Sequence, residues 1–303
     1  MTTQEPSAAS GPEPALSFGS VVDAYERGRP GYPIEAVRWL TGDQPLSVLE
    51  LGAGTGKLTR ALVELGHDVH ATEPDPAMLD RLARSVDVTR LSQTGAEEIP
   101  AADASFDIVI AGQSYHWFDK ERALPEIARV LKRGGSLSLV WNVRDERIPW
   151  VKRFGRLIGT QESGAGPDDA LESSPYFGPV EESVFKQWQV VDRESIQDMV
   201  LSRSNVATLP PDEREAKLRE VLAFYDDFGR GMDGMQVPYV VRCYRAVVGI
   251  RPKTEEPPMD AAVPVTDDTP APYEGEPTQP VRLGELTDPP SDDDSGVLLI
   301  DFR

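Results

Sequence analysis

The chain alternates between short continuous apolar runs and longer stretches in which apolar residues return every three or four positions. A continuous run is typical of a strand buried on both faces, whereas the second spacing is typical of an amphipathic helix. Five strands are predicted in this way, at residues 48–51, 69–72, 88–92, 105–111 and 136–141. Because helical stretches separate them, the pattern predicts an α/β fold with a doubly wound, parallel sheet.

Two of the predicted helices have recognisable beginnings. After the first strand, apolar residues keep helical spacing from Leu58 to Leu65. Asp75 and Pro76 are expected to be the N-cap and the first residue of the next helix. A carboxylate can accept from the first N–H groups of a helix, and proline has no N–H that would be left without a partner there.

The same spacing extends to both sides of this central region. A helix is expected over residues 119–131, and Gly134 and Gly135 are expected to end it. Further helices are predicted at residues 21–25, 34–40 and 211–228, and β-forming residues predict strands at 185–191 and 237–248.

Three glycines, Gly52, Gly54 and Gly56, lie between the first strand and its helix. Glycine permits positive φ and lacks a Cβ, and the first N–H groups of a helix have no partners within it. We therefore expect a small polar ligand to bind at this turn. A purely structural turn is the alternative.

The spacing of these glycines bears on the class of ligand. A phosphate-binding P-loop has the pattern G-x-x-x-x-G-K-[ST], but Leu51 lies five positions before Gly56, and Leu58 follows Lys57. The dinucleotide pattern G-x-G-x-x-G would need glycine at position 57. What remains is E-x-G-x-G-x-G, which begins at Glu50.

Glu73 directly follows the second predicted strand, about twenty residues after the glycine turn. In α/β nucleotide sites, an acid at this position accepts hydrogen bonds from ribose hydroxyls. Most glutamates are ordinary surface residues, but the position after the strand favours the ribose interpretation.

Four motifs in order resemble class I S-adenosylmethionine-dependent methyltransferases of the type-11 group. They are ELGAGTG at 50–56, TEPDPAML at 72–79, AEEIP at 96–100 and SFDIVIAGQSYHWFD at 105–119, and the resemblance covers residues 16–248. It implies a Rossmann-like fold with a doubly wound, mostly parallel seven-stranded sheet, to which helical insertions add a substrate pocket.

The resemblance also implies the cofactor, S-adenosylmethionine, and the residues that bind it. Gly52 and Gly54 would approach its methionine part, Glu73 its ribose, and Ala96 and Glu97 its adenine. The full expected set is Glu50, Gly52, Gly54, Gly56, Glu73, Pro74, Ala96, Glu97 and Gln113. Many relatives carry an aspartate before that alanine, but this chain has Gly95 there, so either Glu97 replaces the aspartate or the hydrogen bond to adenine is missing.

His116 follows the fourth predicted strand, between Tyr115 and Trp117. Histidine titrates near neutral pH, so this position makes His116 a candidate general base, with Tyr115 as a second catalytic candidate. Hydrogen bonding to a backbone carbonyl is the structural alternative for the histidine. Tyr115 and Trp117 could equally line the acceptor pocket or face the sulfonium of the cofactor.

Near the N-terminus, aromatic and cationic side chains surround a Pro-Gly break. They could form a lid, because connecting segments of this kind often carry function, or they could belong to an ordinary packing helix. The candidates for the lid are Tyr25, Arg29 and Tyr32.

The composition narrows the classes of function. A formal charge of -20 argues against binding to a phosphate backbone, so no nucleic-acid partner is expected. The start lacks a signal peptide, no run has membrane-spanning length and Cys243 is the only cysteine, so a cytoplasmic location is expected.

Three regions are expected: a disordered N-terminus at 1–14, a methyltransferase domain at 15–250 and a disordered tail at 251–303. The tail has 13 acidic and 4 basic residues and ten of the 27 prolines, a composition too polar to form a core. Its last eight residues, GVLLIDFR, are apolar enough to dock on the domain or on a partner.

Two functions stay open at this stage. The first is transfer of a methyl group to an O, N or C centre of a small molecule, without a metal. The second is a non-catalytic protein of the same fold that uses the acidic tail to bind a protein partner. A nicotinamide oxidoreductase is a remote third possibility.

Overall fold

A computed structural model describes residues 22–88, 90–159, 166–229 and 234–249 of the chain. The expected disordered N-terminus, at residues 1–14, and the expected acidic tail, at residues 251–303, lie outside these described residues. None of the described helices is long and apolar enough to cross a membrane.

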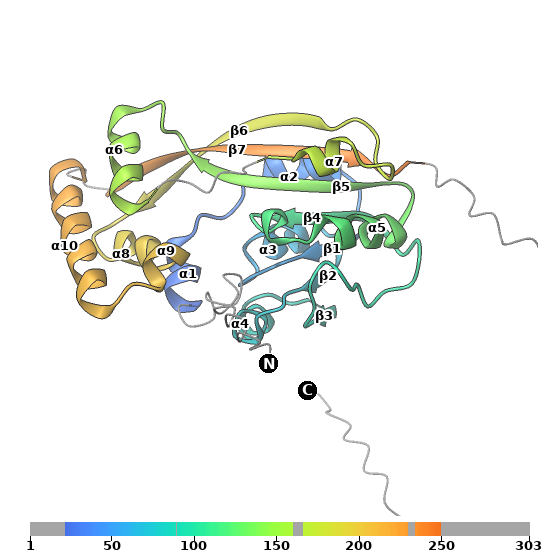
Figure 1. Cartoon of the computed structure of the whole chain (residues 1–303), viewed down its shortest axis with the longest axis horizontal. Coiled ribbons are helices and arrows are strands. Elements are labelled where there is room, and N and C mark those ends of the chain that lie inside the picture. Colours follow the sequence, from blue (N-terminus) through green and yellow to red (C-terminus); the bar gives the residue numbers. More distant parts are fainter. Residues whose placement is uncertain (1–21, 89, 160–165, 230–233, 250–303) are drawn as a thin grey trace, which may run out of the picture. The chain divides into compact units, whose positions relative to one another are not determined.

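The described strands form one seven-stranded sheet in the order β3-β2-β1-β4-β5-β7-β6, as Figure 1 shows. β1 to β5 pair in parallel, and β7 runs antiparallel to both β5 and β6. Both the predicted doubly wound architecture and the seven strands are therefore confirmed. The strands are β1 Ser47–Leu51, β2 Asp68–Thr72, β3 Arg90–Ser92, β4 Phe106–Gly112, β5 Leu131–Arg144, β6 Glu181–Val191 and β7 Met235–Val247.

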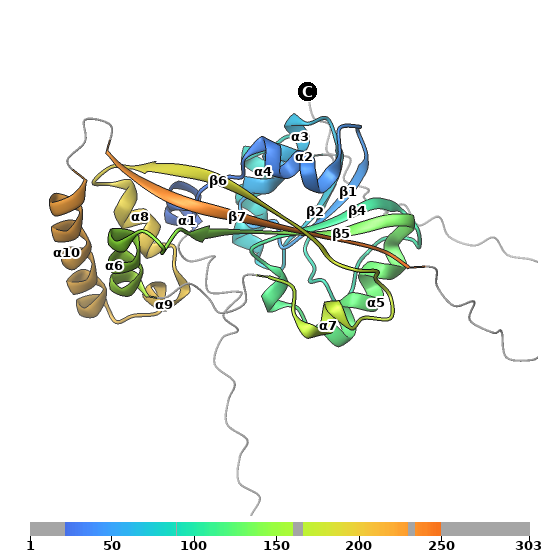
Figure 2. The same ribbon diagram turned by 90° about the horizontal axis from the view of Figure 1, so that it is seen from above.

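Helices cover both faces of the parallel part of the sheet (Figure 2). One face carries α2 Ile34–Thr41, α3 Lys57–Glu64 and α4 Pro76–Ser85, and the other carries α5 Lys120–Val130 and the short α7 Asp169–Glu172. The strands alternate their side chains between two separate cores, so that Val48 packs on the first face and Leu49 on the second. Asp75 caps α4 as predicted, because its Oδ1 accepts from the N–H groups of Ala77 and Met78.

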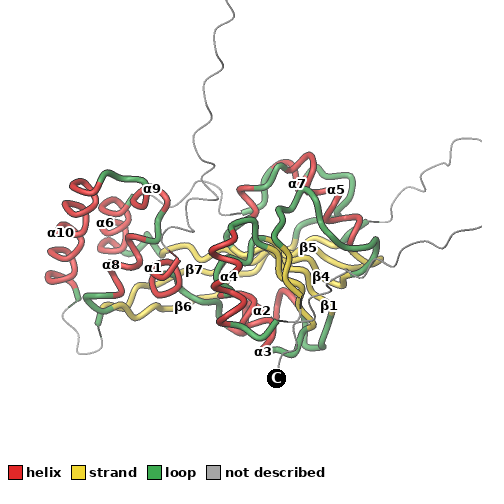
Figure 3. Tube along the Cα trace, turned by 90° about the horizontal axis from the view of Figure 1, so that it is seen from below, coloured by secondary structure: helices red, strands yellow, loops and turns green. Residues whose placement is uncertain are grey.

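A third core lies where the long strands β5, β6 and β7 extend past the parallel part of the sheet (Figures 1 and 3). Helices from distant parts of the sequence gather there. They are α1 Val22–Gly28, α6 Pro149–Ile158, α8 Ser195–Leu201, α9 Ser204–Ala207 and α10 Pro211–Phe228. Phe154 stacks on Phe224 in this core at a ring distance of 5.3 Å. The predicted helices at 34–40 and 211–228 are confirmed.

The predicted end of the helix after Asp119 is wrong. The helix ends at Val130, and β5 begins at once with Leu131. Gly134, with φ +80°, therefore bends a strand rather than closing a helix, and a Cβ on Gly135 would lie 2.7 Å from the Asp107 carbonyl oxygen. Gly135 thus lets β5 run close to its neighbour β4.

Candidate functional site

A cavity of about 620 Å³ lies at the carboxyl ends of β1, β2 and β4, the edge at which open α/β sheets bind ligands. Residues from the glycine turn, the ends of β2 and β4, and the N-terminal segment meet there. Its lining residues are Tyr25, Arg29, Gly52, Gly54, Glu73, Pro74, Met78, Gly95, Ala96, Glu97, Gly112, Gln113, Ser114, Trp117, Phe118, Asp119 and Arg122.

The glycine turn needs its glycines for different reasons. Gly52, Gly54 and Gly56 have φ values of +69°, +58° and +89°. A Cβ on Gly52 would lie 2.6 Å from that of Ser114, whereas on Gly54 it would make only ordinary contact with the Tyr25 ring, 3.8 Å away. Gly54 therefore leaves room beside the cavity. Gly56 packs on α4 and does not line the cavity.

The Glu73 carboxylate is buried at the cavity wall with 7% of its surface exposed. Its two oxygens accept from the N–H groups of Gly54, at 2.8 Å, and Asp75, at 3.0 Å. Burial raises the pKa of this carboxyl, and the two N–H groups oppose that shift. Glu73 thus joins the end of β2 to the glycine turn and keeps acceptor capacity for further donors, since each carboxylate oxygen has two lone pairs.

Glu50 lies beneath the turn rather than on the cavity wall. It is 1% exposed on β1, and its Oε2 has no hydrogen-bond partner among the residues that the structure describes. Burial raises the pKa of its carboxyl to about 8, while Thr59 opposes and the nearby Glu73 adds to the shift. The carboxyl is therefore protonated at neutral pH.

Glu50→Gln is expected to remove a pH dependence of folding stability. Folded Glu50 keeps its proton up to pH about 8, whereas the ordinary value is 4.5, so its contribution is fully present below 4.5 and is lost as pH rises through 8. Glutamine does not titrate, so the free energy of unfolding of the variant should exceed that of the wild type by about 5 kcal/mol at pH 9.

Urea unfolding at pH 5 and pH 9 measures this difference. Glu64→Gln at the exposed end of α3 is the matched control and should change the free energy of unfolding by less than about 0.5 kcal/mol at both pH values. Equal pH profiles for wild type and Glu50→Gln would show that Glu50 is ionised in the fold.

The segment after β3 forms another wall of the cavity. Ala96 is buried there, and Glu97 Oε1 accepts from the Asp119 N–H at 2.9 Å. A Cβ on Gly95 would lie 2.6 Å from the other Glu97 oxygen, so glycine admits the Glu97 side chain at this point. Pro74 and Met78 line the cavity from the β2 side.

The end of β4 brings Gln113 and Ser114 to the cavity. Gln113 has φ +60°, unusual for a residue other than glycine, and its Nε2 donates to the Asn142 carbonyl at 3.1 Å. The Ser114 hydroxyl donates to the Leu51 carbonyl at 2.7 Å. These contacts fix the turn that follows against β1 and β5.

The turn η2 Tyr115–Trp117 points its side chains in different directions. Trp117 is 37% exposed and lines the cavity. Tyr115 is fully buried in the core on the face of the sheet that carries α5 and α7. Its hydroxyl donates there to Asp168 at 2.9 Å, and burial raises the pKa of this hydroxyl. This position gives no support to a catalytic Tyr115. His116 is half-buried, and its ring centroid lies 4.8 Å from that of Trp117.

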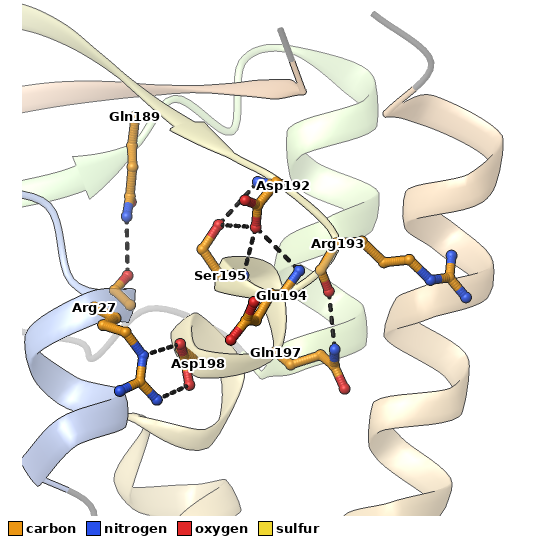
Figure 4. A network of polar contacts seen from close by, with 9 residues as sticks. Arg27, Gln189, Asp192, Arg193, Glu194, Ser195, Gln197 and Asp198 are labelled. Atoms are coloured by element: carbon orange, nitrogen blue, oxygen red, sulfur yellow. Dashed lines mark hydrogen bonds and ion pairs between the residues drawn. The ribbon is translucent and has the colours of Figure 1, made fainter. Parts of the chain in front are cut away.

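The N-terminal segment joins the third core to the glycine turn. Arg27 makes two hydrogen bonds to Asp198 on α8, at 2.6 and 3.0 Å (Figure 4), and a Cβ on Gly28 would lie 2.4 Å from the α8 backbone. On the other side, Thr55 donates to Glu26 at 2.6 Å. Helix α1 is therefore held on one side by α8 and on the other by the glycine turn.

Of the lid candidates, two line the cavity and one does not. The Arg29 guanidinium stacks over the Tyr25 ring at 5.3 Å, and both residues border the cavity. Tyr32 packs behind Gly112 of the cavity wall, since a Cβ on that glycine would lie 2.7 Å from the Tyr32 hydroxyl. Burial raises the pKa of that hydroxyl.

Sequence reasoning missed several lining residues. They are Met78, Gly95, Gly112, Ser114, Phe118, Asp119 and Arg122. All of them lie within or beside motifs that already contained a candidate, so taking each motif's flanks together with its central residues would have found most of them.

Comparison with known proteins agrees with this architecture. Residues 49–139 match the family described as a methyltransferase domain. An uncharacterized methyltransferase of Mycobacterium tuberculosis is 44% identical over 237 residues, covering 77% of this chain and 96% of the relative. One of Schizosaccharomyces pombe is 34% identical over 220 residues, covering 68% and 87%.

A solved structure from Anaeromyxobacter dehalogenans, named as a type II methyltransferase, matches the fold with a TM-score of 0.52. It is 23% identical in sequence, and the match covers 72% of this chain and 97% of that one. Together with the sequence relatives, these matches confirm the resemblance: the chain belongs to the class I S-adenosylmethionine-dependent methyltransferases.

Proposed function

We propose that this protein binds S-adenosylmethionine in the 620 Å³ cavity and transfers its methyl group to an O, N or C centre of a small molecule. One observation carries the proposal. A glycine turn with positive φ and a buried glutamate from the next strand meet on a single cavity wall, which suits a ligand with both a charged amino-acid part and a ribose.

The cofactor roles follow from the position of each wall. Gly52 and Gly54 would approach the methionine part, and Glu73 would accept from the ribose hydroxyls. Pro74, Ala96 and Glu97 would enclose the adenine. Glu50 and Gly56 support the turn from below, since neither lines the cavity.

The acceptor would lie towards the aromatic and cationic side of the cavity. Trp117, Tyr25 and Arg29 border this side, with Gln113 at the end of β4. The bound cofactor supplies an electrophilic methyl group on a good leaving group, so the chain's own work is to position the acceptor and, where needed, to remove its proton. His116, beside Trp117, is the candidate for that proton transfer.

A non-catalytic scaffold is the weaker alternative. Relatives named as methyltransferases favour an enzyme, and nothing in the described residues supports a protein partner for the acidic tail. We retain a cytoplasmic location as part of the proposal, on the composition, in which Cys243 is the only cysteine.

Calorimetric titration and a transfer assay test the proposal together. The protein should bind S-adenosylhomocysteine and should not bind NAD, because the turn lacks the dinucleotide spacing. With labelled S-adenosylmethionine and a metabolite extract, label should appear in small molecules. Binding of NAD with no binding of S-adenosylhomocysteine would refute the proposed function.

A further inference from the structure

Gln113, the residue after β4, has a backbone conformation that glycine ordinarily supplies. Its φ is +60°, and Ala104 is the other described residue besides glycine with a positive φ. This conformation is uncommon for side chains other than those of asparagine, aspartate and histidine, and residues held in it are frequent at ligand sites. Gln113 also lines the cavity. It is therefore a candidate for direct contact with a ligand.

The hydrogen bonds around Gln113 explain its backbone conformation. Its N–H donates to the Val140 carbonyl at 3.0 Å and so continues the pairing of β4 with β5. The side chain of the next residue, Ser114, donates instead to the Leu51 carbonyl of β1 at 2.7 Å. The positive φ turns the chain from one neighbouring strand towards the other. A glycine would make this turn without strain, so the turn itself does not call for a glutamine.

The side-chain amide of Gln113 is held in one orientation. Its Nε2 donates to the Asn142 carbonyl at 3.1 Å, and a carbonyl can only accept, so the nitrogen has to face β5. Asn142 is buried, and its own side chain donates to Gly31 and accepts from Gln187. Because the two polar atoms of an amide diverge from one carbon, Oε1 is directed away from β5. No residue in the described part of the chain donates to Oε1, whose two lone pairs are left for a ligand.

Gln113 lies at the end of the cavity where the methionine part of the cofactor is proposed. A Cβ on Gly52 would lie 2.6 Å from the Ser114 Cβ, so the end of β4 touches the glycine turn. The proposed adenine wall, at Ala96 and Glu97, follows β3 instead, and β1 and β2 separate β3 from β4 in the sheet. Since the methyl group is bonded to the sulfur of the methionine part, Gln113 is nearer to the reacting end of the cofactor than to its adenine.

We propose that Gln113 Oε1 accepts a hydrogen bond from the group that is methylated, so that the methyl acceptor reacts at an N–H or O–H group and not at carbon. This inference rests on the proposed function, because it narrows the acceptor class of the same cavity. It also assigns Gln113, which the sequence placed in the cofactor set, to the acceptor.

The course of the reaction explains why such a hydrogen bond favours it. A lone pair of the nitrogen or oxygen forms the bond to the methyl carbon, and the carbon–sulfur bond breaks. Its electrons stay on sulfur, which gives S-adenosylhomocysteine, and a proton of the reacting group passes to a base or to water. As the new bond forms, the reacting atom becomes more positive and its N–H or O–H becomes a stronger donor. The bond to Oε1 is therefore stronger in the transition state than in the ground state, which raises turnover.

The first test identifies the methylated atom. Wild type is incubated with a metabolite extract and S-adenosylmethionine that carries carbon-13 in its methyl group. NMR of the products distinguishes methyl groups on nitrogen, oxygen and carbon, and the label should be found on nitrogen or oxygen. Label on carbon would overturn the inference and leave the proposed function intact. No labelled small molecule, together with no binding of S-adenosylhomocysteine, would instead refute the proposed function.

The second test is Gln113→Met, which keeps the length of the side chain but lacks Oε1. In a dilution series of the active extract fraction, its maximal rate should fall by about 10- to 100-fold, because one hydrogen bond to a group of growing charge is lost. Its affinity for S-adenosylhomocysteine should stay within about threefold of wild type. An unchanged maximal rate would overturn the inference. So would an equal loss of cofactor affinity, which is expected if Gln113 binds the cofactor.

Gln113→Gly removes the contact and the strain together, and it replaces Gln113→Met if that variant does not fold. Glycine adopts a positive φ freely, so this variant should fold, yet its maximal rate should be as low as that of Gln113→Met. A rate equal to wild type would show that position 113 serves the turn alone and would overturn the inference. The matched control is Ala104→Gly, which makes the same kind of backbone change at an exposed residue outside the cavity and should leave the rate unchanged.

Discussion

Glu73→Ala is expected to weaken the binding of S-adenosylhomocysteine by about 10²- to 10⁴-fold. The buried carboxylate would accept two hydrogen bonds from the ribose, and charge-assisted bonds of this kind contribute about 1.5 to 3 kcal/mol each. The loss has a second source, because Glu73 also accepts from the N–H groups of Gly54 and Asp75 and so holds the turn in place.

Glu73→Gln separates charge from packing. A glutamine has one acceptor oxygen, and its amide would place a donor against the N–H of Gly54 or Asp75, so it should bind nearly as weakly as Glu73→Ala. Glu98→Ala, an exposed residue beyond the cavity wall, is the control and should bind normally. Calorimetry measures all three, and affinity within about threefold of wild type for Glu73→Ala would rule out the ribose contact.

The parts of the site that sequence could predict are those coded by short motifs. The turn from Gly52 to Gly56 and the acid at Glu73 each follow a buried strand directly, and parallel strands end at the same edge of the sheet. Adjacent strands therefore bring these residues together in any fold of this class. The N-cap at Asp75 was also predictable, because capping depends only on neighbours two and three residues away.

The placement of Arg29 and the burial of Arg144 could not be predicted in this way. The contact of Arg29 with Ser202 joins residues 173 positions apart, and it exists only because α1 packs on α8. No local pattern marks Arg144 as buried, because a charged residue at the end of a strand is ordinarily exposed. Its burial follows from the third core, whose helices the sequence indicated only in part.

The turn after β4 shows a different limit. Sequence placed Tyr115, His116 and Trp117 together at the cavity, but a 3₁₀ turn rotates successive side chains by about 120°. Tyr115 therefore enters the opposite core while Trp117 faces the cavity. The position of the turn was therefore predictable from the sequence, but the direction of each of its side chains was not.

His116→Gln is expected to lower turnover by about 10²- to 10⁴-fold while leaving the affinity for S-adenosylhomocysteine nearly intact. The reason is position: the His116 ring lies against Trp117, which lines the cavity, and contacts of a general base often tighten only when the substrate is bound. Turnover is measured with the acceptor found in the transfer assay, and cofactor affinity by calorimetry.

The pH profile separates a general base from a structural histidine. An acceptor that ionises on its own needs less help, so the rate of His116→Gln should keep rising with pH after the wild type has levelled off. His67→Gln provides the structural comparison, because the His67 ring bonds the Thr41 hydroxyl at 3.0 Å and the Leu46 N–H at 3.2 Å, away from the cavity. That variant should lose thermal stability without a selective loss of turnover. A stable His116→Gln protein with unchanged turnover would remove proton transfer by His116 from the mechanism and leave the chain with positioning alone.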